Sequence, residues 1–258
     1  MKRIIVLNAK GGCGKTTVAT NIASGYAIRG FKTALIDYDP QGSSMEWLRA
    51  RAAALTPIRG IAISDASSVP LAGAWQLKVP RDTQRVVVDT PAGLRAMDLA
   101  GRLTNEDLLV VPIQPSAIDI RATADFIRDL LLAGRLRPQD RRLAIIGNRT
   151  KPGAALAVLK GFLENLQIPV LEHLKDASLY GAAAEQGLGV AELPPQQARR
   201  VASAWQGIFN WLEGGNAPLP LVKATEPEAP KETPLPAFLV QTLEREAGEK
   251  PVDPKDLN

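Results

Sequence analysis

The stretch Lys10-Gly-Gly-Cys-Gly-Lys-Thr-Thr17 decides the fold class of this chain. It follows the apolar run Ile4–Leu7 and leads into a helix-like stretch from Lys15 to about Arg29. Glycines allow a backbone to curve until its N–H groups face an anion, and the dipole of a following helix favours the same charge. Lys15 adds a cation for nucleotide phosphates, and the Thr16 hydroxyl can coordinate Mg²⁺. The pattern therefore predicts a nucleotide phosphate site.

Apolar strand-like runs alternate with helix-like stretches, a pattern typical of βαβ units. The expected strands cover residues 4–7, 32–36, 85–88, 108–113, 143–147 and 168–171, and the expected helices cover residues 15–29, 45–54, 118–132, 154–166 and 196–212. Residues 58–76 mix Gly, Ser and Pro and receive no assignment. The expected fold class is α/β, a P-loop nucleoside triphosphatase whose mainly parallel, twisted sheet has helices on both faces.

The composition changes after Gly214-Gly215, and we expect a domain boundary there. Eight of the chain's 20 prolines lie beyond that point. Residues 223–258 contain five Lys/Arg and eight Asp/Glu, which gives a net charge of −3. Because the whole chain carries +4, residues 1–222 carry a net charge of +7. Residues 1–214 are predicted to form the ATPase domain, and residues 215–258 are predicted to be a disordered, acidic, Pro/Glu-rich tail. A basic domain is compatible with nucleic-acid binding, although many enzymes share that charge.

Several classes of protein are excluded by composition. The single cysteine, Cys13, rules out an intramolecular disulfide and any all-cysteine metal or iron–sulfur site within one chain. The longest apolar runs are far too short to cross a bilayer, and the first residues lack the pattern of a signal peptide. We therefore expect a cytoplasmic protein.

The phosphate loop resembles the deviant Walker A box of the ParA/MinD family, which has an extra lysine at the start of the loop. That lysine corresponds to Lys10. In the family it reaches across a nucleotide-sandwich dimer to the phosphates of the other subunit, where a cation stabilises charge on the transferred phosphoryl group. The resemblance implies a Mg²⁺-dependent ATPase that forms a homodimer on binding ATP.

Two segments that follow apolar strands are similar to the family's switch regions. Residues 36–44, Ile-Asp-Tyr-Asp-Pro-Gln-Gly-Ser-Ser, resemble switch I, which implies that Asp39 orients or activates the attacking water and that Asp37 supports the Mg²⁺ shell. Residues 86–93, Val-Val-Val-Asp-Thr-Pro-Ala-Gly, resemble the Walker B and switch II segment. By that match Asp89 holds Mg²⁺ water ligands, and the Gly93 backbone senses the γ-phosphate. Many relatives have Pro-Pro within the stretch that reads Thr-Pro-Ala in this chain, which leaves the coupling of switch II open.

Two later segments complete the resemblance, which covers residues 1–212. Val110–Ser116 followed by Asp119 is similar to the next strand-to-helix turn of the family, and Ile145–Arg149 is similar to the strand that ends in an adenine-contacting asparagine, Asn148. The implied nucleotide contacts come from Gly11, Gly12, Cys13, Gly14, Lys15, Thr16, Thr17 and Asn148. The implied Mg²⁺ contacts come from Thr16, Asp37 and Asp89, and the implied catalytic residues are Lys10, Lys15 and Asp39.

The remaining residues discriminate among branches of this group. The nitrogenase iron protein and the arsenite-pump ATPases need cysteine ligands that this chain lacks. MinD-like proteins bind membranes through a basic amphipathic C-terminal helix, whereas the tail of this chain is acidic and Pro-rich. The ParA branch remains, whose ATP-bound dimer binds DNA without sequence preference through Lys and Arg contacts to phosphates.

The expected DNA contacts are Arg199 and Arg200, because relatives use their C-terminal region for DNA. Further candidates are Lys175, Arg121, Arg128, Arg135 and Arg137, and His173 is expected to be structural. The chain begins three residues before its first expected strand, so we expect no preceding helix-turn-helix domain and no sequence-specific DNA recognition.

The resulting prediction is a ParA-type ATPase on the nucleoid that positions a cargo. A ParB-like or cargo-adaptor partner would stimulate hydrolysis, and no membrane would be involved. The cargo could be a plasmid, a chromosome or a protein assembly, and the compact switch I and the Asp89–Gly93 variant are similar to carboxysome-distribution ATPases. The alternatives are a MinD-like membrane-associated regulatory ATPase and a P-loop enzyme that acts on a small-molecule substrate.

Overall fold

The computed structural model describes residues 1–63, 78–136, 142–151, 153, 157, 161–162, 168–175 and 178–214. The chain divides into two compact units, Met1–Val222 and Lys223–Asn258. The predicted tail lies outside the described residues, as do most of the predicted helix at 154–166 and the end of the unassigned segment at 64–77.

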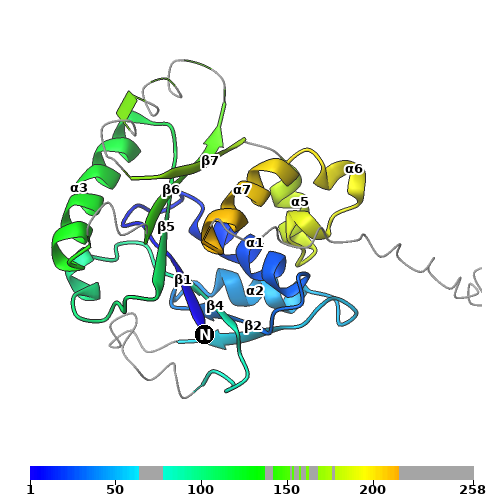
Figure 1. The fold of residues 1–258 in the computed structure, drawn as a ribbon. Helices are drawn as coiled ribbons and strands as arrows, with labels where there is room; N and C mark the ends of the chain where they lie inside the picture. The colour runs from blue at the N-terminus through cyan, green and yellow to red at the C-terminus, as the bar shows by residue number, and fades with distance from the viewer. Residues whose placement is uncertain are drawn as a thin grey trace, which may run out of the picture. The chain divides into compact units, whose positions relative to one another are not determined.

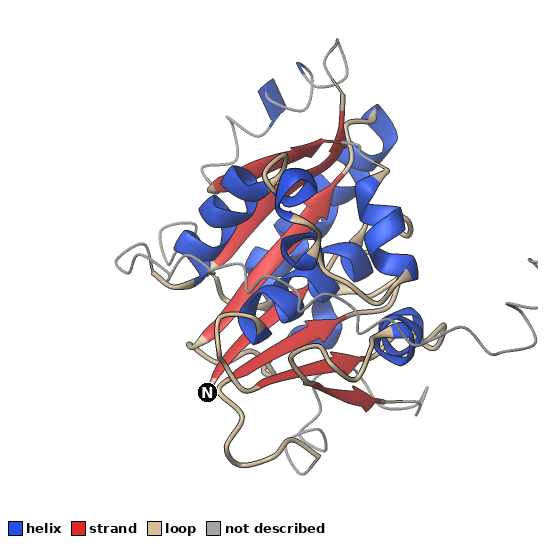
Figure 2. Cartoon of the chain, turned by 90° about the vertical axis from the view of Figure 1, so that its right-hand side faces the viewer, coloured by secondary structure: helices blue, strands red, loops and turns tan. Residues whose placement is uncertain are grey.

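The first unit is built on a parallel sheet of seven strands, drawn in red in Figure 2. The strand order is β3-β2-β4-β1-β5-β6-β7, and every pair is parallel. The strands are β1 (Lys2–Val6), β2 (Thr33–Asp37), β3 (Ile58–Ala62), β4 (Arg85–Asp89), β5 (Asp107–Ile113), β6 (Leu143–Thr150) and β7 (Val170–Lys175). The parallel α/β fold predicted from the sequence is therefore confirmed.

The order of the strands brings the loop after β1, Asp37 and Asp89 together at the carboxyl ends of the strands. β1 lies between β4 and β5, so the loop that follows β1 emerges where the direction of winding reverses. Val6 pairs with Asp89 at the end of β4, and Asp89 pairs with Asp37 at the end of β2. Ligands of open α/β sheets bind outside the carboxyl ends of the strands at such a reversal.

Helices cover both faces of the sheet (Figure 1). On one face, Ile4, Val6 and Leu35 pack with residues of four helices: α1 (Lys15–Ala27), α2 (Ser43–Ala50), α5 (Leu179–Glu185) and α7 (Ala202–Leu212). On the other face, Ile5 and Val88 pack against α3 (Ala117–Ala133) and the short 3-10 helix η2 (Ala96–Leu99). The inner strands β1, β2, β4, β5 and β6 are almost wholly buried, which explains why they read as continuous apolar runs rather than alternating ones. The outer strands β3 and β7 are more exposed.

The C-terminal part of the unit differs from the expectation in two ways. The single helix predicted over 196–212 is in fact α6 (Pro195–Ala198) and α7, separated by residues 199–201. The predicted core stripe is nevertheless confirmed, since Val201, Trp205, Ile208, Phe209 and Leu212 are buried in one cluster and Ala204 packs against it. His173, expected after a strand, lies within β7 instead, because that strand starts and ends later than predicted. No helix among the described residues is both long and apolar enough to cross a bilayer.

A buried ion pair joins α2 to the 3-10 helix η4 (Val190–Glu192). Arg51, directly after α2, donates Nη1 to Glu192 Oε2 at 2.7 Å and Nη2 to Glu192 Oε1 at 2.5 Å. The two side chains are only 5% and 4% exposed. Trp47 of α2 adds a hydrogen bond from Nε1 to the Leu188 carbonyl at 3.2 Å. These contacts fix α2 against a segment about 140 residues later in the chain.

Glu192→Gln should lower the free energy of unfolding by about 3 kcal/mol, because the Arg51 charge would remain buried without its partner. Urea denaturation of the two proteins would measure the difference. Asp82→Asn is the matched control, because the Lys32–Asp82 pair is 65% and 62% exposed and should leave the denaturation midpoint nearly unchanged. Equal effects of the two substitutions would contradict the role assigned to Glu192.

Candidate phosphate-binding site

The loop between β1 and α1 has the backbone geometry of an anion cradle. Gly12 and Gly14 have φ angles of 74° and 96°, a region that side chains rarely allow. A Cβ atom on Gly14 would lie 2.0 Å from Nδ2 of Asn148, so glycine is also required there by the close approach of β6. The loop leads directly into α1, whose first residue is Lys15.

Side chains hold this loop through its carbonyl oxygens. The Lys15 ammonium, in a residue only 6% exposed, donates to the Lys10 carbonyl at 3.1 Å. Gln114 donates from Nε2 to the Gly12 carbonyl at 2.5 Å, and Asn148 donates from Nδ2 to the Cys13 carbonyl at 2.8 Å. Three carbonyl oxygens of the loop are thereby engaged by side chains.

The backbone N–H groups of the same loop remain available. Within the described part of the chain, none of the N–H groups of Gly11–Thr17 donates to an oxygen atom, although those of Cys13 and Lys15 face the Cys13 sulfur. The next N–H group, of Val18, donates to the Gly14 carbonyl at 3.0 Å. Consecutive free N–H groups at a helix start, beside the Lys15 ammonium, match the oxygens of a phosphate chain. The residues therefore fit the phosphates of a nucleotide.

Lys10 lies at the rim of the loop with its ammonium turned toward α3. Its backbone N–H donates to Asn8 Oδ1 at 3.0 Å, and Asn8 in turn donates to the Pro112 carbonyl at 2.9 Å. The Lys10 ammonium lies 3.8 Å from Asp119 Oδ1, and 42% of the lysine side chain is exposed. Asp119 lies in the first turn of α3, which begins at Ala117 and is capped by Ser116. A cation in this position can exchange Asp119 for another partner.

Asp89 places a buried carboxylate below the loop. Its Oδ2 accepts a hydrogen bond from the Ser44 hydroxyl at 2.6 Å, and its buried Oδ1 has no hydrogen-bond partner among the described residues. Burial raises the pKa of Asp89 to about 6, against the opposing influence of the Ser44 and Thr16 hydroxyls. An unsatisfied oxygen beside the Thr16 hydroxyl fits a hydrated Mg²⁺ ion.

The aspartates of the predicted switch I occupy different environments. Both oxygens of Asp37 accept backbone N–H groups, from Asp39 at 2.9 Å, Ser44 at 3.1 Å and Met45 at 3.2 Å. Burial raises the pKa of Asp37, and these hydrogen bonds oppose that shift. Asp39 is partly exposed, and its Oδ1 accepts the Gln41 N–H at 3.0 Å. Asp37 thus anchors the start of α2 and the turn that carries Asp39.

The predicted switch II segment touches the phosphate loop directly. The Gly93 N–H, expected to sense a γ-phosphate, donates to the Ala9 carbonyl at 2.8 Å, and the Thr90 hydroxyl donates to the Val6 carbonyl at 3.0 Å. Gly93 has a φ angle of 75°. No group of three or more His, Cys, Asp or Glu side chains within the described ranges could form a metal cage.

A cavity of about 350 Å³ adjoins the loop on the side of β6 and α5. Thr17 and Asn148, both predicted nucleotide contacts, line it with Arg149, Lys175 and Tyr180. Both polar atoms of the Asn148 side chain already bond to backbone groups, since Nδ2 bonds to Cys13 and Oδ1 accepts the Arg149 N–H at 2.9 Å. Asn148 therefore supports the loop in this structure, and its adenine contact stays a prediction.

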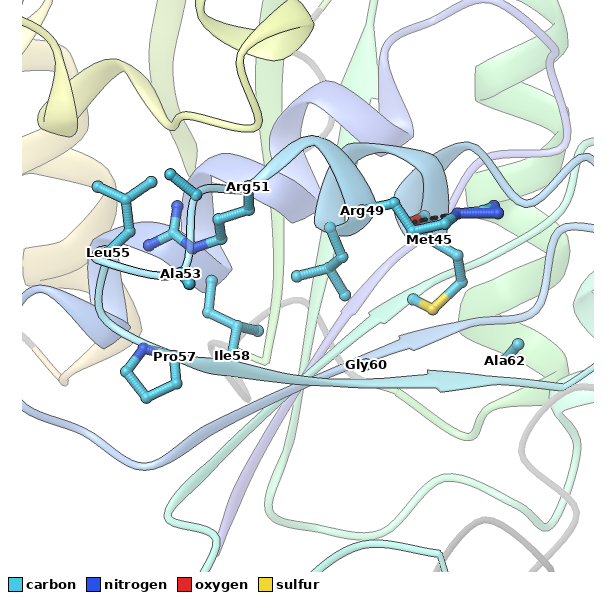
Figure 3. Close-up of a pocket in the computed structure, with 11 residues that line it drawn as sticks. Met45, Arg49, Arg51, Ala53, Leu55, Pro57, Ile58, Gly60 and Ala62 are labelled. Carbon is cyan, nitrogen blue, oxygen red and sulfur yellow. Dashed lines mark hydrogen bonds between the residues drawn. The ribbon is translucent and has the colours of Figure 1, made fainter.

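A wider groove of about 550 Å³ lies between α2 and β3 (Figure 3). Its floor is apolar, with Leu48 of α2 facing Gly60 of β3 so closely that a Cβ on Gly60 would lie 2.7 Å from Leu48 Cδ1. Arg49 lies along its rim and donates to the Met45 carbonyl at 3.4 Å. None of its lining residues belongs to the phosphate loop, so the groove is separate from the candidate site.

The predicted DNA-contacting residues are only partly brought together. Arg199 and Arg200 are exposed in the break between α6 and α7, rather than at the start of one long helix. Arg121 and Arg128 belong to α3, which covers the opposite face of the sheet. Arg135 directly follows α3 and its C-cap residue, Lys175 ends β7, and Arg137 lies outside the described residues.

The parallel sheet, the glycine loop and Lys15 at the start of α1 define the class of P-loop nucleotide-binding proteins. Within that class, the chain belongs to the family described as the CobQ/CobB/MinD/ParA nucleotide binding domain, whose model matches residues 4–190. The resemblance predicted from the loop and switch motifs is confirmed.

One curated relative and two solved structures illustrate this similarity. Maintenance of carboxysome distribution protein A of Halothiobacillus neapolitanus is 31% identical over 196 residues, which cover 74% of this chain and 87% of the relative. A protein of Borrelia burgdorferi assigned to plasmid partition, bound to AMPPNP, is 14% identical with a TM-score of 0.63, covering 81% of this chain and 98% of its own. MinD of Pyrococcus horikoshii with Mg-ADP is 15% identical with a TM-score of 0.58, covering 83% and 96%. These two structures contain the kinds of ligand, adenine nucleotide and Mg²⁺, that the sequence predicts here.

Asp89→Asn should stabilise the metal-free, nucleotide-free protein above pH about 6. The carboxyl has a higher pKa in the folded state than in the unfolded chain, so its contribution to stability is complete below pH about 4 and is lost as the pH rises through about 6. At pH 7 the gain should be roughly 3 kcal/mol, since a shift of about two pKa units costs about 1.4 kcal/mol per unit. Urea denaturation between pH 4.5 and 7 would measure it.

The exposed Asp125 of α3 offers a matched control. Asp125→Asn should change little across the same pH range, because 66% of that side chain is exposed. If Asp89→Asn gave a constant effect from pH 4.5 to 7, burial of the Asp89 charge would not be its cause.

Proposed function

We propose that this chain is an ATP-hydrolysing, ParA-type positioning protein that dimerises on binding ATP and then binds DNA without sequence preference. The free N–H groups of Gly11–Thr17, together with Lys15, carry this proposal. The 31% identity to a carboxysome distribution protein supports a cargo-positioning role. A partner protein on the cargo would stimulate hydrolysis and so release the dimer from DNA. The folded domain would be residues 1–214, with residues 215–258 as a separate tail.

The proposed chemistry uses residues from three strand ends. The loop N–H groups and Lys15 would bind and orient the phosphates. Thr16 and Asp89 would hold Mg²⁺, which would supply positive charge to neutralise the charge that develops on the phosphates. Asp39, on the turn anchored by Asp37, orients the attacking water and accepts its proton. Asp39 suits that task because its side chain is partly exposed and only one of its oxygens accepts a hydrogen bond among the described residues.

Lys10 has a different task, which is to act on the partner subunit. In the isolated chain its ammonium rests near Asp119 at the rim of the loop. On dimerisation it would leave Asp119 for the phosphates bound by the other subunit. Replacement of one carboxylate by a more highly charged phosphate chain makes this exchange favourable.

Lys10→Ala should raise the dissociation constant of the ATP-bound dimer at least tenfold, whereas nucleotide binding by the monomer should persist. Sedimentation velocity with ATP and Mg²⁺ would measure the dimer dissociation constant, and equilibrium binding of a fluorescent ATP analogue would measure nucleotide binding.

Lys15→Ala should abolish nucleotide binding, and Asp39→Ala should leave ATP-bound dimers that fail to hydrolyse ATP. Normal turnover by Asp39→Ala would refute the role of Asp39, and wild-type dimers of Lys10→Ala would refute that of Lys10. The exposed Lys32→Ala is the control for loss of a lysine.

Arg199→Ala combined with Arg200→Ala should weaken DNA binding about tenfold or more and reduce its dependence on salt, because two phosphate contacts would be lost. Fluorescence anisotropy with duplexes of unrelated sequence at several salt concentrations would measure this. Arg121→Ala with Arg128→Ala, on the opposite face of the sheet, is the matched control. An equal loss from both double variants would contradict the assignment to the α6–α7 break.

Two alternatives remain distinguishable by direct experiment. The fold is shared with MinD, so a membrane-associated regulatory ATPase is the first alternative. Co-sedimentation with liposomes and with plasmid DNA, each with ATP, distinguishes this alternative from the proposed function. Lipid binding without DNA binding would contradict the proposed function. The second alternative is a P-loop enzyme that acts on a small-molecule substrate. ATP turnover that requires a metabolite but neither DNA nor a partner protein would favour this alternative.

A further inference from the structure

A second cavity lies between α1, η4, α6 and α7 and has a volume of about 150 Å³. Seven of its lining residues are apolar: Val190, Ala191, Ala198, Val201, Ala202, Trp205 and Phe209. The three polar ones are Asn21, Arg29 and Gln206. None belongs to the phosphate loop or to the predicted switch segments, so this cavity is distinct from the candidate nucleotide site.

Two of the three polar residues are held by hydrogen bonds within the fold. Asn21 donates from Nδ2 to the Thr17 carbonyl at 2.8 Å and accepts the Val190 N–H on Oδ1 at 2.7 Å. Gln206 donates from Nε2 to Asn210 Oδ1 at 2.8 Å. The amide groups of Asn21 and Gln206 therefore mainly form part of the cavity wall.

Arg29 differs from them, because its charge has no carboxylate partner among the described residues. Its Nη1 donates to the Gly25 carbonyl at 2.7 Å, and its guanidinium lies 3.9 Å from the centre of the Phe209 ring. Its Nε is buried without a hydrogen-bond partner. The contacts hold the guanidinium in place but leave its charge uncompensated.

Three other arginines of the domain with little exposure are each paired with a carboxylate. Arg3 pairs with Asp107, Arg51 with Glu192, and Arg85 with Glu213. Burial lowers the pKa of Arg29 below its usual value, which reflects the free-energy cost of a cation in this position. An anion placed beside Arg29 would remove that cost, since a buried charge is tolerated best when paired.

We propose that this cavity binds a small monocarboxylate with a compact apolar body, its carboxylate paired with Arg29. The apolar body would lie against Val190, Val201 and Trp205. An apolar cavity of about 150 Å³ accommodates one benzene-sized group. One uncompensated guanidinium matches a single negative charge, and apolar walls disfavour a polyanion such as a nucleotide.

The position of the cavity connects two parts of the molecule. α1 carries Lys15 at its first residue, and Arg29 follows its end. Ala198 and Val201 of the cavity wall flank Arg199 and Arg200 in the break between α6 and α7. A bound carboxylate would therefore lie next to the segment proposed to contact DNA. The binding proposal itself does not depend on the proposed function.

The test uses the full-length chain and ¹⁹F NMR titrations with 4-fluorobenzoate and with its neutral counterpart, 4-fluorobenzamide. The carboxylate should bind at least tenfold more tightly than the amide, and Arg29→Gln should remove that preference. Arg29→Lys, which keeps the charge and can still donate to the Gly25 carbonyl, should retain part of it. Equal affinity for the two probes, or a preference unchanged in Arg29→Gln, would overturn the proposal. So would the absence of binding by both.

A second variant tests the position of the binding site while Arg29 is kept. Ala198→Leu fills the cavity without removing Arg29, and it should weaken binding of 4-fluorobenzoate at least tenfold. Circular dichroism and binding of the fluorescent ATP analogue would show that both variants remain folded. Full 4-fluorobenzoate binding by a folded Ala198→Leu protein would place the probe elsewhere and so overturn the assigned site.

The carboxylate could belong to a free metabolite or to the C-terminus of a peptide. N-acetyl-Gly-Leu with a free carboxylate, compared with its C-terminal amide, distinguishes these sources. Arg29-dependent binding of the free dipeptide that is tighter than that of 4-fluorobenzoate would assign the site to a chain end. Weaker binding would assign it to a small free acid, and either result supports the proposed chemistry.

Discussion

Hydrogen bonds to the carbonyl oxygens of the phosphate loop are the interactions on which the rest of the site depends. Lys15, Gln114 and Asn148 each engage one of these carbonyls, from α1, from the end of β5 and from β6. A glycine-rich loop has many accessible conformations, and these anchors select one in which the carbonyls are engaged and the N–H groups are free. Preorganised dipoles of this kind require little rearrangement when an anion arrives.

The aspartates beneath the loop connect it to the outer helices. Ser44, in the first turn of α2, donates its backbone N–H to Asp37 and its hydroxyl to Asp89. The far end of α2 is held by the buried pair of Arg51 and Glu192, which reaches η4 and the segment that continues into α6. The candidate Mg²⁺ site and the exposed arginines after α6 are therefore joined by a rigid helix and an ion pair. Contiguous packed elements of this kind can carry energetic coupling between distant sites.

The fold and the phosphate loop could be predicted from sequence because their signals are local. The run Ile4–Leu7, the glycines after Lys10 and the Lys-Thr pair lie within about a dozen residues, and each has a direct physical meaning. Asn8, Ser44 and Gln114 had no such signal, since an isolated amide or hydroxyl looks like any turn residue until its partner is known. The partners of their side chains, except that of the Asn8–Lys10 turn, lie about 45 to 115 positions away. The break after α6 was missed because apolar periodicity continued across it through Val201.

The sequence by itself determined that this chain forms a parallel α/β sheet with a nucleotide phosphate loop and an extra lysine at its start. Those properties depend on backbone freedom, apolar periodicity and neighbouring charge, which are encoded over short stretches. Only the tertiary structure decided that Asp119 holds Lys10 and that, among the residues the structure describes, Asp89 Oδ1 has no hydrogen-bond partner and Arg29 has no carboxylate partner. Each of these is a relation between distant residues in three dimensions, because burial and pairing arise when the chain packs.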